Sequence, residues 1–261
     1  MKIKKAIQIS AAFLILTLFF SACTSEPQAA IRISYRDFLN LESTLPHNQN
    51  SFTQGLFIHN GKMYESTGLY GESAVYKNIN PYRGIPESDY KFESDIFAEG
   101  SVVFNGKLYV LSWKENKVFV FDPDTLSLEK ELPYNREGWG LTTDGNYLIA
   151  SDGSANLYYM DENLNDIKAL TVTVDGKETA NLNELEFIDG RIWANVWLTN
   201  EILIINPENG GAVVVIDFSG LHDKNSADSD DVLNGIAYNP ETKRIYITGK
   251  RWNSLYEFKI K

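Results

Sequence analysis

Short apolar runs alternate with polar residues along most of the chain, and turn-forming pairs separate the runs. These pairs are Asn60-Gly61, Asn105-Gly106, Asp144-Gly145 and Asp189-Gly190. Asn-Gly or Asp-Gly between alternating residues favours a β-hairpin, because both turn positions adopt a positive φ. No segment has convincing helical periodicity, so the pattern predicts an all-β protein.

The predicted hairpins belong to a repeat that occurs five times. Each copy opens with a short phrase, and the phrases are Gln54-Gly55-Leu56, Glu99-Gly100-Ser101, Trp139-Gly140-Leu141, Asn183-Glu184-Leu185 and Asn234-Gly235-Ile236. Their middle residues lie 45, 40, 44 and 51 positions apart, which is the period of a four-stranded propeller blade. The repeat therefore predicts a five-bladed β-propeller, since a sixth blade would need a further copy that the sequence does not contain.

A third strand follows in most copies, and the last copy ends after three strands. The third strands are 118–121, 157–160, 202–205 and 255–258. One strand-like segment, residues 31–35, precedes the first copy and has no partner within the repeat. We expect this N-terminal strand to close the last blade, because such closure joins the chain ends and removes exposed sheet edges.

Residues 1–22 have the pattern of a secretory signal peptide, with three lysines before the apolar run 11–20. That run is too short to span a bilayer, which needs roughly 20 residues. Phe20-Ser21-Ala22-Cys23 resembles a bacterial lipobox, although Phe20 stands where Leu is more usual. We therefore expect an exported protein, acylated at Cys23 and anchored to the cell envelope, with residues 23–30 as a tether and 31–261 as the propeller domain. Soluble secretion with an incidental cysteine is the alternative.

Composition excludes several classes of function. Loss of the signal peptide removes three of the 24 basic residues and none of the 35 acidic ones, so the formal charge changes from −11 to −14. This charge argues against nucleic acid as a partner. Cys23 is the only cysteine, which excludes an internal disulfide and, once it is acylated, a thiol nucleophile. His47, His59 and His222 lack the spacing of metal ligands, and we expect them on the surface.

We expect the functional site on one face of the propeller. Blades run antiparallel from the axis outward, so the start of the first strand and the end of the second lie on the same face. The residues at these two places are, blade by blade, Gln54 and Gly68, Glu99 and Trp113, Trp139 and Asp152, Asn183 and Trp197, and Asn234 and Lys250. Aromatic walls with a few convergent polar groups are typical of a pocket for a small molecule or a peptide end.

Each of these residues also has a structural interpretation. A Trp in a blade commonly packs in the core, and a Glu or Asn before Gly commonly stabilises a turn. Ordinary packing, however, would repeat one residue type in every blade. Residue types that change from blade to blade on a constant scaffold favour a site built onto the fold.

Ordered motifs at and around these positions resemble those of the plant and bacterial glutaminyl cyclotransferases. They are Ser51-Phe-Thr-Gln-Gly-Leu56, Tyr64-Glu-Ser-Thr-Gly68, Phe97-Ala-Glu-Gly100, Glu137-Gly-Trp-Gly-Leu-Thr142, Ser151-Asp-Gly-Ser154, Leu182-Asn-Glu-Leu-Glu186, Ala194-Asn-Val-Trp197, Asp231-Val-Leu-Asn-Gly-Ile-Ala237 and Thr248-Gly-Lys250. The resemblance covers about residues 47–258. It implies a five-bladed propeller that converts N-terminal glutamine of peptides or proteins into 5-oxoproline with loss of ammonia. It also implies no relation to the zinc-dependent cyclases of animals, and no catalytic cofactor.

The resemblance assigns roles to individual residues. Glu99 would take a proton from the attacking α-amine and deliver it to the departing nitrogen. Gln54 and Asn183 would hydrogen-bond the substrate, and Lys250 would polarise the developing oxyanion or hold a substrate carbonyl. The apolar walls that raise the pKa of the Glu99 carboxyl group would come from Phe52, Phe97, Trp113, Trp139 and Trp197. Asp152 and Asn234 share the rim by register alone, and we expect them to be structural.

Other interpretations remain open at this point. A non-enzymatic propeller lipoprotein that binds a peptide or a sugar at the same mouth would keep the aromatic walls and lose the proton carrier. A scaffold for envelope assembly would need an exposed apolar patch. We expect a monomer without a catalytic metal. The acidic segment 223–231 is expected to be solvated, with a structural calcium ion as the alternative.

Overall fold

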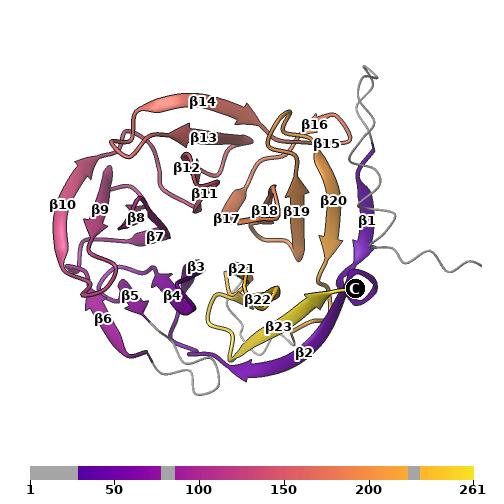
Figure 1. Ribbon diagram of the computed structural model, residues 1–261, viewed down its shortest axis with the longest axis horizontal. Helices are drawn as coiled ribbons and strands as arrows, with labels where there is room; N and C mark the ends of the chain where they lie inside the picture. Colours follow the sequence, from indigo (N-terminus) through magenta and orange to yellow (C-terminus); the bar gives the residue numbers. More distant parts are fainter. Residues whose placement is uncertain (1–28, 78–85, 223–229) are drawn as a thin grey trace, which may run out of the picture.

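The computed structural model describes residues 29–77, 86–222 and 230–261. Five sheets form a ring around a central axis, so the five-bladed β-propeller that the repeat predicts is confirmed (Figure 1). The expected signal peptide, Cys23 and most of the acidic segment 223–231 lie outside the described residues. No helix in the described part of the chain is long and apolar enough to cross a membrane.

Each blade is a meander of four strands that are paired in order from the axis outward. Blade one contains β3 (Thr53–His59), β4 (Lys62–Thr67), β5 (Ala74–Lys77) and β6 (Ser88–Lys91). Blade two contains β7 (Ala98–Phe104), β8 (Lys107–Ser112), β9 (Lys117–Phe121) and β10 (Leu128–Pro133). Blade three contains β11 (Leu141–Thr143), β12 (Leu148–Ser151), β13 (Asn156–Met160) and β14 (Asp166–Thr171).

The hairpin of β15 (Thr173–Val174) and β16 (Lys177–Glu178) leads into the fourth blade. Blade four contains β17 (Leu182–Ile188), β18 (Arg191–Val196), β19 (Glu201–Ile205) and β20 (Ala212–Asp217). Blade five contains β21 (Leu233–Asn239), β22 (Arg244–Gly249) and β23 (Ser254–Ile260), and its outer strand comes from the N-terminal part of the chain.

The closing strand is not the one that we expected. β2 (Leu39–Pro46) pairs antiparallel with β23 and is the outer strand of blade five. β1 (Ile31–Ser34) pairs parallel with β20 and forms a fifth strand of blade four. The short helix α2 (Tyr35–Phe38) connects β1 and β2 and buries two aromatic side chains in the cluster between blades four and five. The assignment of residues 31–35 was wrong because two strand-like segments precede the first copy, and alternation does not rank them.

The predicted turn pairs have the expected backbone in three of four blades. At Asn60-Gly61 the φ angles are 50° and 71°, and the pairs in blades two and four also have positive φ at both residues. In blade three the Asp144 carboxylate instead accepts hydrogen bonds from the backbone N–H groups of Asn146 (2.8 Å) and Tyr147 (2.9 Å). The tight connection between the two inner strands survives by a different local interaction.

The core consists of five apolar clusters, one at each interface between neighbouring blades. Between blades one and two, Phe57 and Tyr64 pack with Leu108 and Phe119. Leu45 of the closing strand belongs to the cluster between blades five and one. Full burial of such a side chain stabilises the fold by about 1.5–3 kcal/mol, so the ring is held together mainly by its blade interfaces.

The inner strands approach one another closely where the repeat phrases lie. A Cβ atom at Gly55 would lie 2.6 Å from the backbone nitrogen of Ser101, and one at Gly140 would lie 1.9 Å from the backbone oxygen of Asn183. No side chain fits at such distances. The repeated glycine is therefore required by the contact between neighbouring inner strands.

In blade four Glu184 stands where the other phrases have glycine, and its side chain joins three blades. Its Oε1 accepts a hydrogen bond from the backbone N–H of Leu56 (3.2 Å), and its Oε2 accepts one from Ile236 (2.8 Å). The residue is 1% exposed. Burial and the nearby Glu186 carboxylate raise the pKa of Glu184, and the two backbone hydrogen bonds oppose this shift.

The imidazole ring of His47 is buried, with the side chain 5% exposed, contrary to the expectation of a surface histidine. Its Nε2 lies 3.1 Å from Oε1 of Glu65, and its Nδ1 lies 2.7 Å from the backbone oxygen of Trp252. Burial opposes a charge on the ring, but the Glu65 carboxylate and the hydrogen bonds outweigh it and raise the pKa of His47. Glu65 also accepts a hydrogen bond from the Thr53 hydroxyl (2.7 Å), so this network fixes the start of β3.

We expect Glu184→Ala to lower the free energy of unfolding by about 3 kcal/mol, because two buried N–H groups lose their acceptor at about 1–3 kcal/mol each. Glu184→Gln should lie between this variant and the wild type, since one amide oxygen remains as an acceptor. Urea denaturation measures both. Glu178→Ala, at an exposed carboxylate of β16, is the control and should change stability by less than about 0.5 kcal/mol. Equal effects at Glu184 and Glu178 would contradict the structural role of Glu184.

Candidate active site

The starts of the inner strands meet at one end of the axis and bring together the side chains expected there. Gln54 lies on β3, Glu99 on β7, Asn183 on β17 and Asn234 on β21, and all four are buried. Trp139 lies in the loop just before β11. The second set of expected positions follows the second strand of each blade, so Lys250 comes directly after β22.

A chain of hydrogen bonds connects the Glu99 carboxyl group to blades one and five. Gln54 donates from Nε2 to Oε1 of Glu99 (3.1 Å). Asn234 donates from Nδ2 to Oε1 of Gln54 (3.3 Å) and to the backbone oxygen of Thr53 (2.8 Å). Both ends of the Gln54 amide therefore have protein partners, and Asn234, which we expected to be structural, orients that amide.

Burial determines the electrostatics of the two charged groups in the site. Glu99 is 4% exposed and Lys250 is 3% exposed. Burial raises the pKa of Glu99 well above its usual range; the Lys250 cation opposes this shift, and the carboxylates of Glu115 and Glu137 add to it. Burial also lowers the pKa of Lys250 to about 8, against the attraction of Glu99 and Asp230. Burial thus favours the uncharged form of each group.

Aromatic rings line the site in two groups. Phe97 contacts Phe52, Trp113 and Tyr70, with ring centroids 6.2, 5.4 and 5.5 Å away respectively. The Lys250 ammonium lies 4.7 Å from the Phe52 ring centroid. The second group is Trp139 and Trp197, whose rings are perpendicular with centroids 5.5 Å apart.

Gly68 and Gly153 make room for these rings. A Cβ at Gly68 would lie 2.2 Å from the Phe97 ring, and one at Gly153 would lie 2.6 Å from the Trp139 ring. Gly68, one of the expected rim positions, therefore acts by having no side chain.

Comparison with known proteins agrees with this geometry. The profile of a family described as glutamine cyclotransferase matches residues 14–260. This chain belongs to the glutamine cyclotransferase family. A curated glutaminyl-peptide cyclotransferase of Arabidopsis thaliana is 35% identical over 260 residues, which cover 97% of this chain and 81% of the relative. The crystal structure of Myxococcus xanthus glutaminyl cyclase matches with a TM-score of 0.81 and 31% identity, over 88% of this chain and 98% of that chain.

Two polar residues of the site, Asn183 and Asp152, differ in whether their side chains have hydrogen-bond partners. Asn183 is 3% exposed, and its Oδ1 atom has no hydrogen-bond partner among the described residues. Such an atom is costly to bury unless a ligand supplies a donor. Asp152 instead accepts hydrogen bonds from the backbone and side chain of Ser154, which agrees with the structural role expected for it.

Three residues near the site were missed by sequence reasoning. Tyr70 donates a hydrogen bond to Oε1 of Glu115 (2.9 Å), and burial and this carboxylate raise the pKa of Tyr70 to about 12. Glu137 contacts two tryptophans of the walls. Both carboxylates lie in loops, and their contacts are not visible in the repeat, although Glu137 lies two residues before the third phrase.

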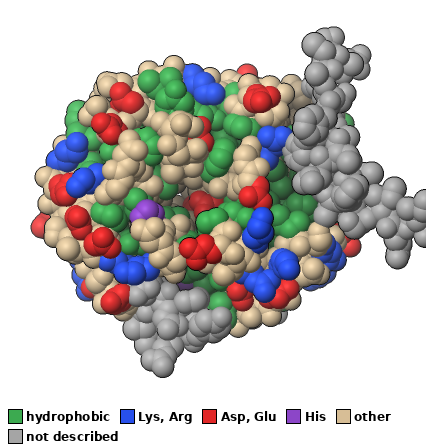
Figure 2. Space-filling view, in the orientation of Figure 1, with side chains coloured by type: hydrophobic (Ala, Val, Ile, Leu, Met, Phe, Trp, Pro, Cys, Tyr) green, Lys and Arg blue, Asp and Glu red, His purple; other side chains and the backbone are tan. Residues whose placement is uncertain are grey.

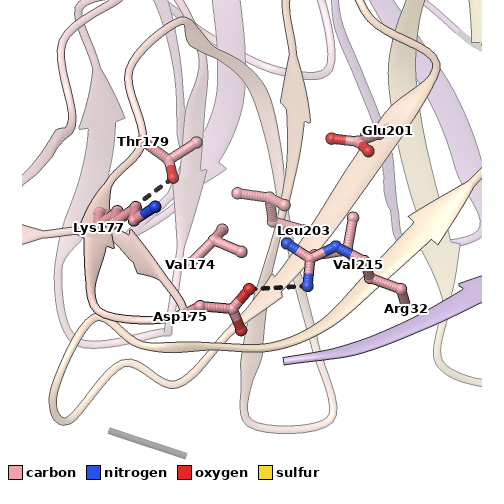
Figure 3. A pocket seen from close by; sticks show the side chains of 8 residues that line it. All are labelled: Arg32, Val174, Asp175, Lys177, Thr179, Glu201, Leu203 and Val215. Atoms are coloured by element: carbon pink, nitrogen blue, oxygen red, sulfur yellow. Dashed lines mark hydrogen bonds and ion pairs between the residues drawn. The ribbon is translucent and has the colours of Figure 1, made fainter. Parts of the chain in front are cut away.

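The structure also has a cavity of about 330 Å³ that is separate from these residues. It lies beside the β15–β16 hairpin, and the ion pair of Arg32 with Asp175 (2.8 Å) forms part of its lining (Figure 3). None of the expected site residues lines it. Two of its charged groups, Arg32 and Asp175, pair with each other.

Among the described residues, no group of three or more His, Cys, Asp or Glu is placed to hold a metal ion. On the face seen in Figure 2, acidic and basic side chains are interspersed among hydrophobic and other groups. Within the site, Lys250 and Glu99 are a buried cation and a buried carboxyl group that influence each other's pKa.

Proposed function

We propose that this protein is a glutaminyl-peptide cyclotransferase, which converts the N-terminal glutamine of a peptide or protein into 5-oxoproline and releases ammonia. Its family and the names of its relatives support this activity. The observation that carries the proposal is a fully buried carboxyl group, Glu99, oriented by Gln54 between aromatic walls.

The reaction moves one proton between two nitrogen atoms of the same residue. The neutral α-amine attacks Cδ of its own side chain, the new C–N bond closes the ring, and the bond from Cδ to the amide nitrogen breaks. The amine loses a proton and the amide nitrogen gains one before it leaves as ammonia. Ionised Glu99 would accept the first proton and then donate it, which is commonly worth about 10²- to 10⁴-fold in rate.

The raised pKa of Glu99 suits this double role. A carboxyl group at its usual pKa is a weak base and, at neutral pH, is rarely protonated. Burial raises the pKa of Glu99, which makes its carboxylate a stronger base and its protonated form more populated. The Gln54 amide donates to Oε1 of Glu99 and so fixes the direction of the carboxyl group, with Asn234 behind it. In this proposal Gln54 positions Glu99 instead of binding substrate.

The remaining groups would bind and polarise the substrate. Lys250, with a pKa of about 8, is a cation at neutral pH that would stabilise the oxyanion formed at Cδ. The unpartnered Oδ1 of Asn183 would accept a hydrogen bond from the substrate amine or amide. The aromatic walls would hold the glutamine side chain folded back on its own amine, which removes much of the entropic part of the barrier.

The protein without Cys23 should release ammonia from a dipeptide that begins with glutamine. Glu99→Gln should lower kcat/KM by about 10³-fold or more, because the carboxyl group that the Gln54 amide orients, and that transfers the proton, is lost. A coupled ammonia assay measures both.

The same dipeptide with an acetylated N-terminus is the control, since its amine is blocked and it should release nothing. Ammonia release no faster than background by the wild type would favour the alternative, a propeller that binds peptides or sugars without turnover. A folded Glu99→Gln variant with full activity would show that another group transfers the proton. A chelator should leave the rate unchanged, and strong inhibition would contradict catalysis without a metal.

Lys250→Met should lower kcat/KM at pH 7 by about 100-fold. It should also change both the acid limb and the alkaline limb of the plot of kcat/KM against pH. Wild-type activity should fall as pH rises through about 8, where Lys250 loses its charge, and this limb should vanish in the variant. The limb governed by Glu99 should move to higher pH, because the Lys250 cation normally lowers the pKa of Glu99.

Lys168→Met is the matched control, since this lysine lies 4.0 Å from the Tyr159 ring centroid on the outer strands of blade three. It should leave both limbs in place. An unchanged alkaline limb in Lys250→Met would assign that limb to another group.

We also propose that the protein is exported and anchored by lipid at Cys23, as a monomer. The sequence from Lys2 to Cys23 supports this proposal. The described chain enters the propeller at the rim, where β1 lies outside β20 (Figure 1). An anchor attached there would leave the mouth at the axis open to peptide ends.

Cys23→Ser should move the protein from the membrane fraction to the soluble fraction and keep its cyclase activity, because the thiol is the acylated group. Fractionation and blotting of the expressing bacterium measure the distribution. Ser21→Ala is the control and should stay with the membrane. A Cys23→Ser protein that remains with the membrane would contradict the lipid anchor.

A further inference from the structure

The Glu137 carboxylate lies at the junction of blades two and three and contacts both of their tryptophans. Its Oε2 accepts hydrogen bonds from Nε1 of Trp113 (2.9 Å) and from Nε1 of Trp139 (3.2 Å). Its Oε1 lies 3.8 Å from Nζ of Lys114. One oxygen atom thus receives both indole N–H groups from opposite sides of the junction.

The backbone next to Glu137 is fixed to blade two. Gly138 donates its N–H to the backbone oxygens of Ser112 (3.1 Å) and Trp113 (3.0 Å). A Cβ at Gly138 would lie 2.4 Å from the Ser112 oxygen, so only glycine permits this approach. The position of Glu137 relative to Trp113 is therefore set by the main chain as well as by the carboxylate.

The contacts of Glu137 extend to the third tryptophan of the walls and to the solvent side. Trp139 packs edge-on against Trp197, with centroids 5.5 Å apart. Lys114 covers Trp113 at 3.7 Å from its ring centroid while its ammonium faces Glu137. A change at Glu137 would therefore affect the orientation of all three indoles.

We propose that Glu137 is a positioning residue of the cyclotransferase reaction, whose carboxylate holds the indoles of Trp113 and Trp139 in the one arrangement that fits a folded-back glutamine. The inference rests on the proposed function and deepens it. An indole N–H can only donate, and a bond to a carboxylate is roughly twice as strong as one to a neutral acceptor. Without Glu137 the rings would lose the interaction that selects their rotamers.

The charge of Glu137 has a second, separable effect on the site. The charged groups that shift the pKa of Glu99 are Lys250, Glu115 and Glu137. The Glu99 charge in turn helps to raise the pKa of Tyr70. Glu137 raises the pKa of Glu99 and Lys250 lowers it. A neutral residue at position 137 should therefore shift the acid limb of the activity profile to lower pH.

The test compares Glu137→Ala, Glu137→Gln and a matched control, Glu131→Gln. Glu131 pairs with Lys117, and its side chain is 44% exposed, against 43% for Glu137, but it lies on the outer strand β10. We expect Glu137→Ala to lower kcat/KM by about 100-fold, since two charged hydrogen bonds are lost. Glu137→Gln should lose about tenfold or less, because its amide oxygen still accepts from an indole, and its acid limb should move to lower pH. Glu131→Gln should match the wild type.

A double variant shows whether Glu137 acts through the indole. In the Trp113→Phe background the N–H at position 113 is absent and only that of Trp139 still donates to Glu137. There Glu137→Ala should cost about tenfold instead of about 100-fold. Equal losses in both backgrounds would overturn the proposal, as would a Glu137→Ala variant as active as Glu131→Gln. If Glu137→Ala unfolds at the assay temperature, the near-UV circular dichroism of Glu137→Gln decides the matter, because one of the two indoles loses its charged acceptor. A tryptophan signal equal to that of Glu131→Gln overturns the proposal.

Near-UV circular dichroism separates this inference from the proposed activity, because it reports on tryptophan packing without substrate. Glu137→Ala should lose tryptophan signal relative to Glu131→Gln whether or not the wild type releases ammonia. An unchanged spectrum would overturn the positioning role even in an active enzyme. If the wild type is inactive but the Glu137→Ala spectrum is changed, the result contradicts the proposed reaction and leaves the positioning role of Glu137 standing.

Discussion

The close contact of five inner strands around one axis is the constraint on which the rest of the structure depends. Neighbouring strands meet so tightly that Gly55, Gly100 and Gly140 have no room for a Cβ atom. Glu184 replaces the glycine in blade four, and its carboxylate bonds to backbone N–H groups of blades one and five. The apolar clusters between the blades supply most of the stabilisation, and the contacts at the axis determine how the five sheets are aligned.

The same constraint explains why a buried carboxyl group is available at the mouth. The residue before each glycine lies where the inner strands begin to separate, so a polar side chain there is surrounded by protein and still faces a common space. Glu99 and Lys250 are both desolvated in that space, and their pKa values shift toward each other. The hydrogen-bond chain from Asn234 through Gln54 shows that neighbouring blades supply the groups that orient the carboxyl group. A ring of short strands thus gives one residue partners from blades that are distant in sequence.

The sequence predicted correctly those features that depend on a local requirement, such as the backbone conformation of a turn or the length of a blade. The hairpins were predictable because a turn such as Asn60-Gly61 requires a positive φ at both positions. The number of blades and the convergence of Gln54, Glu99 and Lys250 were predictable because the spacing of the phrases follows from the size of a blade. Sequence reasoning failed where the outcome depends on competition or on contacts between loops. Residues 31–35 and 39–46 both alternate, and only the packing of α2 decides which strand closes the ring. The contacts of Glu137 with two indoles, and of His47 with Glu65, join segments whose spacing has no period.

The arrangement of β1, α2 and β2 also determines how the propeller bears mechanical load. These elements form one continuous segment along the rim that pairs with blade four and then with blade five. Because β1 lies parallel to β20 in register from Ile31 to Ser34, a pull on Ala30 along the strand strains these hydrogen bonds together instead of one after another. The ion pair of Arg32 with Asp175 and the hydrogen bond from the Ala30 N–H to the same carboxylate resist the same displacement. A force applied at the N-terminus is therefore carried by the outermost strands, and the inner strands that hold Glu99 are shielded from it.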